Sequence, residues 1–167
     1  MPVRYRTLRS EAFDKLSSHD AEELLSSARM LKRAAAEGRT QPLLRGKHFG
    51  LLGDSSDSAE AELFRRAVVE LGAQLTHIPP PFSDASPVAD VQQCARVLGR
   101  LYDVVECQGI APTLVARIAG GAGVPVFDGI AGARHPTAHL AADLGGNGAP
   151  GDNRRFVLQA VLLSTLA

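Results

Sequence analysis

The sequence is poor in residues that define several protein classes. It contains no tryptophan and only two cysteines, Cys94 and Cys107, which fall in helix-like and strand-like segments. This usage argues against a disulfide scaffold and fits a reducing cytoplasm. No apolar run approaches the ~18 residues that cross a bilayer, and the polar, charged first residues do not resemble a signal peptide. We therefore expect a cytoplasmic protein without a membrane partner.

An excess of charge of either sign is also missing. The 18 lysines and arginines balance the 18 aspartates and glutamates, and the isoelectric point is about 7.0. Without a basic surplus the protein has no global field that attracts nucleic acid, so we predict no nucleic-acid partner. At 167 residues the chain has the length of one ordinary domain.

What the sequence does contain is an alternation of helical and strand-like apolar patterns. These patterns predict helices near residues 20–36, 58–71, 88–100, 112–119, 135–144 and 153–167, and buried strands at 48–53, 74–78, 104–107 and 124–129. Strands joined through helices by right-handed crossovers form a parallel sheet with helices on both faces. The predicted fold class is therefore α/β, a three-layer domain with a four-stranded parallel sheet.

The ends of the helices carry their own signals. Ser17 and Ser18 can cap the first helix and Gly38 can end it, while Asp57 with Glu60 resembles a capping box for the second. The last helix is apolar around most of its circumference and follows a Gly-rich connector. Such a helix needs cover on several sides, so it packs against the helix at 20–36 or meets another subunit.

Several segments resemble, in order and spacing, the carbamoyl-phosphate-binding domain of the aspartate/ornithine carbamoyltransferase family. The similar segments are LLRGKHFGLLG, AVVELGAQLTHI, ARVLGRLYDVV, VPVFDG and HPT. The resemblance implies a single domain at 1–167, with a core at 14–145, a linker at 146–152 and a closing helix at 153–167 that resembles the family's final helix. It also implies that the amino-acid-binding second domain is absent.

The resemblance breaks at the residues that hold phosphate in the family. The family's Ser-Thr-Arg-Thr-Arg loop aligns with residues 57–61, which read Asp-Ser-Ala-Glu-Ala, and no lysine or arginine lies between Lys47 and Arg65. A carboxylate about 4 Å from a phosphate charge opposes it by about 4 kcal/mol at an effective dielectric constant of about 20. We therefore expect the binding of carbamoyl phosphate to be lost.

Other family positions are partly kept. Gln108 stands in place of the arginine that ends the third strand, and Ala138 replaces the glutamine of the HPxQ motif, of which His135, Pro136 and Thr137 remain. The candidate ligand-binding residues are Ser55, Ser56, Asp57, Ser58, Gln108, His135 and Thr137.

Each candidate also has a structural interpretation. The polar loop at 55–58 follows the first strand, where open α/β sheets bind ligands, but serine and aspartate are equally typical of a solvated turn and helix cap. His135 is either a structural remnant or a ligand contact. His135 and His139 have no evident third ligand, so we predict no metal site and no cofactor.

The sequence thus predicts a carbamoyltransferase-like pseudoenzyme that serves as a structural or regulatory subunit. By resemblance, its partners are copies of itself in a trimer, an active carbamoyltransferase or a dihydroorotase. One alternative is a protein that binds a small ligand: an amine, an amino acid or a cation. The other is carbamoyl transfer to ornithine or aspartate with residues donated by a partner chain.

Overall fold

The computed structural model describes residues 16–146 and 150–166. Its helices are α1 (Ser18–Ala36), α2 (Ala59–Glu70), α3 (Val88–Leu101), α4 (Pro112–Ala122), α5 (Leu140–Leu144) and α6 (Pro150–Leu166). Its strands are β1 (His48–Leu52), β2 (Gln74–Ile78), β3 (Val104–Cys107) and β4 (Val126–Asp128). The strands form one parallel sheet in the order β2-β1-β3-β4, which confirms the predicted α/β fold.

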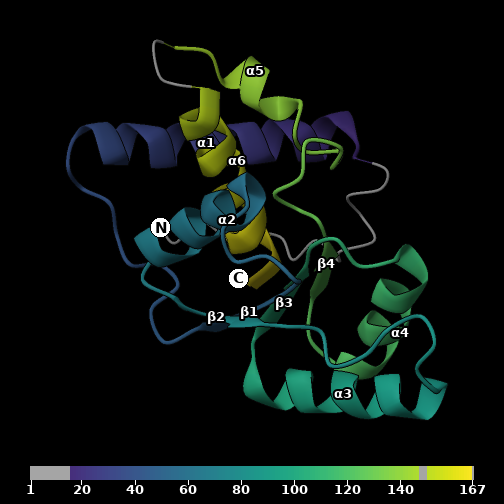
Figure 1. Ribbon diagram of the computed structural model, residues 1–167. Helices are drawn as coiled ribbons and strands as arrows, with labels where there is room; N and C mark the ends of the chain where they lie inside the picture. The colour runs from purple at the N-terminus through teal and green to yellow at the C-terminus, as the bar shows by residue number, and fades with distance from the viewer. Residues whose placement is uncertain (1–15, 147–149, 167) are drawn as a thin grey trace.

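The sheet separates two hydrophobic cores. Helices α1, α2, α5 and α6 cover one face, and α3 and α4 cover the other (Figure 1). Strand β3 shows the division: Val104 points into the core beneath α2 and α6, whereas Val105 and Cys107 point into the core beneath α3 and α4. Both faces of β3 are buried, which explains why its sequence is nearly continuous in apolar residues.

Both ends of α1 agree with the sequence, whereas the amino-terminal end of α2 differs. Ser17 caps α1 by accepting a hydrogen bond from the N–H of Asp20 (3.1 Å), and Gly38 follows the helix at φ +66°, as expected. The cap of α2 is Ser58, whose hydroxyl accepts from Ala61 N–H (3.0 Å), so the expected capping box at Asp57 is wrong. Serine and aspartate cap helices almost equally well, and Asp57 and Ser58 are consecutive, so the sequence alone does not select between them.

The helix predicted at 135–144 is shorter than expected. Residues 131–139 form a series of turns, and α5 occupies only Leu140–Leu144. Pro136 disfavours the helical conformation at His135, the residue before it, so the chain turns at this point and enters the helix later.

Helix α6 begins three residues before the predicted start and lies between α1 and α2, with α5 beside it (Figure 1). Residues 155–165 are buried on every side of the helix. The apolar circumference seen in the sequence is therefore covered within the chain, mainly by α1, α2 and α5. Within the described ranges, no helix has the length and apolarity needed to cross a bilayer.

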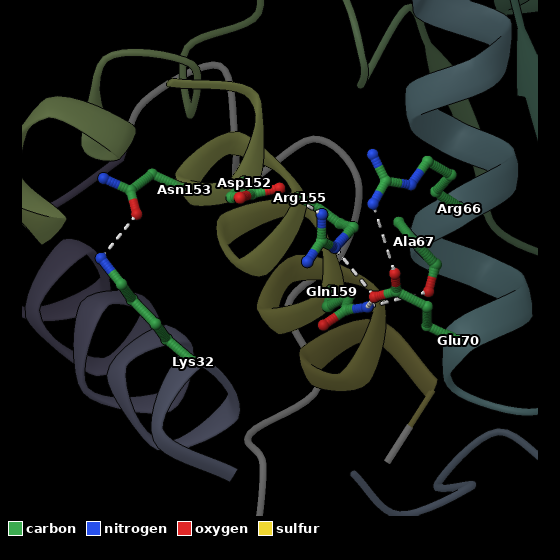
Figure 2. Close-up of polar contacts among 8 residues, drawn as sticks. All are labelled: Lys32, Arg66, Ala67, Glu70, Asp152, Asn153, Arg155 and Gln159. Carbon is green, nitrogen blue, oxygen red and sulfur yellow. Dashed lines mark hydrogen bonds and ion pairs between the residues drawn. The ribbon is translucent and has the colours of Figure 1, made fainter. Parts of the chain in front are cut away.

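Polar side chains fix α6 on two sides (Figure 2). On the α2 side, Arg155 Nε lies 2.8 Å from Glu70 Oε2, and Gln159 Nε2 donates to the same oxygen (3.1 Å). On the α1 side, Lys32 Nζ donates to Asn153 Oδ1 (2.8 Å). Because these groups are directional, they set the rotation of α6, which its uniform apolar surface does not.

Helices α3 and α4 approach each other closely beneath the other face of the sheet. A Cβ at Gly99 would collide with the carbonyl oxygen of Ala122, and a Cβ at Gly121 would lie 3.1 Å from the Ala95 methyl group. Glycine at these two positions is what permits the close contact of the two helices.

Candidate functional site

The chain places its candidate residues at the carboxyl edge of the sheet. Strands β1 and β3 are neighbours, and the connection after β1 leads to β2 on one side whereas the connection after β3 leads to β4 on the other. This arrangement is a topological switch point, where open α/β sheets form ligand crevices. The loop at 55–58 follows β1, and Gln108 follows β3.

The hydroxyl groups of the loop are used within the loop itself. Ser58 caps α2, Ser56 Oγ donates to Asp57 Oδ1 (3.2 Å), and Ser55 Oγ accepts from the N–H of Asp57 (3.3 Å). These hydrogen bonds are those of a polar turn followed by a helix cap.

The amino-terminal end of α2 carries negative side chains. Glu60 and Glu62 lie in the first turn. The nearest basic residue in sequence, Arg65, donates from Nη1 to Glu62 Oε2 (2.7 Å) and from Nη2 to the carbonyl of Ser56 (3.0 Å). A helix amino terminus favours an anion, but Glu60 and Glu62 place two carboxylates in this first turn, and each would repel a phosphate bound nearby.

Gln108 lies beside a buried carboxyl group. Its side chain is buried, and Nε2 makes a long contact of 3.5 Å with Glu106 Oε2, while Oε1 has no hydrogen-bond partner among the residues that the structure describes. Glu106 has no exposed surface and accepts hydrogen bonds from the N–H groups of Ile130 (3.1 Å) and Ala131 (3.3 Å). Burial raises the pKa of Glu106 to about 8, against the opposing effect of these hydrogen bonds.

Glu106 was not among the candidate residues, although the sequence contains a signal for it. Glu106 is the one charged residue of the strand VVEC, and its neighbours Val105 and Cys107 are apolar and buried. A charged residue in a strand buried on both faces needs a polar partner, and here the partner is the backbone that follows β4.

His135 and Thr137 form a local pair. The N–H of Thr137 donates to His135 Nδ1 (3.3 Å), and the Thr137 hydroxyl lies 2.8 Å from the same nitrogen. Nδ1 therefore accepts, and the proton of a neutral imidazole is on Nε2. Thr137 is buried, and its hydroxyl orients the imidazole.

A cleft of about 960 Å³ opens between α4, the end of β4, the turns that follow it and the first turn of α2. Its polar lining includes Glu60, Asp128, Arg134 and His135, and one wall is apolar, with Val115, Ala116, Ala119, Val124 and Val126. His135 is the one candidate residue in this lining; the loop at 55–58, Gln108 and Thr137 lie outside it. The cleft thus joins charges of both signs to an apolar wall.

The cysteines and acidic residues offer little other chemistry. Burial raises the pKa of Cys107 to about 12, with the charges of Glu106 and Asp128 adding to the effect, and it also raises the pKa of Cys94. Neither thiol is therefore ionised near neutral pH, as a nucleophile must be. Among residues 16–146 and 150–166, no group of three or more His, Cys, Asp or Glu side chains is placed to hold a metal ion.

Comparison with known proteins gives a consistent result. Residues 11–144 match the family profile "Aspartate/ornithine carbamoyltransferase, carbamoyl-P binding domain". The catabolic ornithine carbamoyltransferase of Burkholderia mallei is 39% identical over 129 residues, which cover 75% of this chain and 38% of that protein. The chain therefore spans well under half the length of this curated relative.

Solved structures show the same fold. The ornithine carbamoyltransferase of Burkholderia thailandensis superposes with a TM-score of 0.65 at 22% identity and covers 84% of this chain and 47% of its own. The ornithine carbamoyltransferase of Gloeobacter violaceus superposes with a TM-score of 0.59 at 29% identity, covering 84% and 44%.

Proposed function

Because the chain belongs to the aspartate/ornithine carbamoyltransferase family and matches its carbamoyl-phosphate-binding domain, we propose that it is a pseudoenzyme member, a structural or regulatory subunit that does not transfer carbamoyl groups alone. The observation that carries the proposal is the charge at the start of α2. Glu60 and Glu62 occupy the first turn, where the family resemblance places a phosphate-binding loop, and Arg65 is held by Glu62.

The two positions aligned with the family's arginines support the same conclusion. They are Ala59 and Ala61, and the Ala61 side chain has no exposed surface. Neither methyl group can form the charge-assisted hydrogen bonds that hold a phosphate dianion. In the proposed role the chain acts in the cytoplasm by assembling with copies of itself or with an active carbamoyltransferase or dihydroorotase.

Isothermal titration calorimetry with carbamoyl phosphate tests the loss of binding. We expect no saturable heat up to millimolar ligand, with inorganic phosphate giving the same result. The double variant Ala59→Arg, Glu60→Thr restores positive charge to exposed positions at the start of α2 and should bind carbamoyl phosphate at least tenfold more tightly.

The matched control changes net charge equally at a distant site. Glu22→Thr with Ser26→Arg alters exposed residues of α1 and should leave binding unchanged. Micromolar binding by the unmodified protein would overturn the proposal. Light scattering after size-exclusion chromatography, with a pull-down against a full-length carbamoyltransferase, tests the subunit role, and a strict monomer without a partner would contradict it.

The cleft favours a second candidate, the binding of a small amine or amino acid. Glu60 and Asp128 supply negative charge, Arg134 supplies positive charge, and the α4 wall supplies apolar surface. Thermal shift measurements with amines, amino acids and divalent ions test this function. The expected result is a rise in melting temperature that Glu60→Gln reduces, and no stabilisation by any of these compounds would refute it.

The third candidate is carbamoyl transfer completed by a partner chain. It is favoured by His135, which keeps its place in the retained HPT segment and lines the cleft. Mixing the chain with an inactive full-length carbamoyltransferase variant should then restore turnover, and His135→Ala should abolish it. Unchanged turnover after His135→Ala would remove this candidate.

A further inference from the structure

Side chains bind the backbone of residues 130–132, which follow β4, from two sides. From β3, the Glu106 carboxyl group accepts the N–H groups of Ile130 and Ala131. From α6, Arg154 Nη2 donates to the carbonyl oxygens of Ala131 (2.9 Å) and Gly132 (3.0 Å). The peptide groups of one short turn are thus bound by an acceptor on one side and a donor on the other, by residues 22 to 25 positions away.

The first turn of α2 approaches the same place. A Cβ at Gly132 would lie 3.7 Å from Glu60 Oε1, an ordinary contact distance, so the Glu60 carboxyl group lies beside the turn. Burial lowers the pKa of Arg154, and the nearby Glu60 carboxylate opposes this effect. Elements β3, α2 and α6 therefore meet at residues 129–132.

This turn leads into one wall of the cleft. Gly129 and residues 132–136 all belong to the cleft lining, and His135 follows Gly132 by three residues, with its N–H bonded to the Gly132 carbonyl (3.2 Å). The carbonyl of Gly132 accordingly receives hydrogen bonds from both Arg154 and His135. Any shift of the Arg154 guanidinium is transmitted directly to the backbone that carries the imidazole.

We propose that Arg154 and Glu106 are positioning residues that hold residues 129–132 between α6 and β3, so that the closing helix sets the shape of the cleft and the orientation of His135. The inference does not depend on the proposed loss of carbamoyl phosphate binding. It implies reciprocal coupling between the cleft and α6. A molecule that enters the cleft and moves this turn changes how α6 packs, and a change in the packing of α6 changes the affinity of the cleft for that molecule.

Amide hydrogen exchange measured by NMR tests the proposal. In Arg154→Met the amides of Ile130 and Ala131 should exchange at least tenfold faster, while reference amides in β1 and β3 keep their rates, because the turn loosens without global unfolding. The His135 Cε1 proton should shift in the same variant. Arg66→Met, which removes an exposed arginine of α2, is the control and should leave the turn unchanged.

Two further variants keep the test decisive. Arg154→Lys retains the charge and one donor and should recover part of the protection, whereas Glu106→Gln should loosen the same amides from the opposite side. Unchanged exchange at Ile130 and Ala131 in both Arg154→Met and Glu106→Gln would overturn the proposal. An equal increase at every core amide would also overturn it, since that result describes general destabilisation.

Discussion

Replacing Glu106 with glutamine should change how the stability of the protein depends on pH. In the folded protein this carboxyl group has no exposed surface, and burial raises its pKa from 4.5 to about 8. Gln108 is its side-chain partner. Burial, and after it the Glu106 and Asp128 charges, raises the pKa of the adjacent Cys107 thiol to about 12. At neutral pH the folded protein therefore keeps Glu106 protonated, whereas the unfolded chain releases this proton.

The sign and size of the effect follow from proton binding. Between pH 4.5 and about 8 the unfolded chain has released this proton and the folded chain retains it. The free energy of unfolding then falls by about 1.4 kcal/mol per pH unit, or about 5 kcal/mol across the window. The contribution is favourable below pH 4.5, is lost as pH rises toward 8, and stays constant above it.

The assay is urea unfolding at several pH values between 4.5 and 9, comparing the protein with Glu106→Gln. Subtracting the two curves removes the titration of all other groups that the substitution leaves unchanged. The free energy of unfolding of the unmodified protein minus that of Glu106→Gln should fall steadily with pH and level off near pH 8. A flat or rising difference would show that Glu106 is ionised in the folded protein and would refute the reasoning.

Two other substitutions test the packing. Gly99→Ala should destabilise the protein by about 3 kcal/mol in urea unfolding because its Cβ collides with the Ala122 carbonyl. Gly120→Ala, in open space on α4, should stabilise the protein by about 0.5–1 kcal/mol. Equal effects of the two substitutions would contradict the close contact of α3 and α4. Arg155→Met should cost about 2 kcal/mol because Glu70 loses its buried charged partner. Arg66→Met, which removes the exposed partner of the same carboxylate, should cost less than about 0.5 kcal/mol. A similar loss in both variants would show that burial of the arginine is unimportant.

Local patterns in the sequence were sufficient to predict the fold. The alternation of apolar segments predicted the four strands of the described sheet and their parallel arrangement, with the clearest signature in β1 and β3, which are buried along nearly their whole length. The cap at Ser17 was predictable because the interaction spans three residues. The cap at Ser58 was misplaced by one residue because Asp57 and Ser58 are both good caps, and only the path of the loop selects between them.

The candidate site was less predictable, for a physical reason. Arg154 and Glu106 bind backbone groups, which every residue type can supply. The sequence of the bound turn therefore does not reveal these contacts. Family resemblance could point to His135 and Gln108, but it could not reveal that Gln108 contacts a buried carboxyl group or that α6 reaches the turn beside the cleft. These contacts depend on tertiary structure alone.

The position of α6 between α1 and α2 has a consequence for synthesis. Lys32 and Asn153, which join α1 to α6, are 121 residues apart, so this face of the sheet stays open until nearly all of the described chain has been made. During that interval the nascent chain presents the apolar surfaces of α1 and α2, and such surfaces attract chaperones and promote aggregation. Ribosome-bound chains that stop before α6 should therefore be the form of this protein most dependent on chaperones.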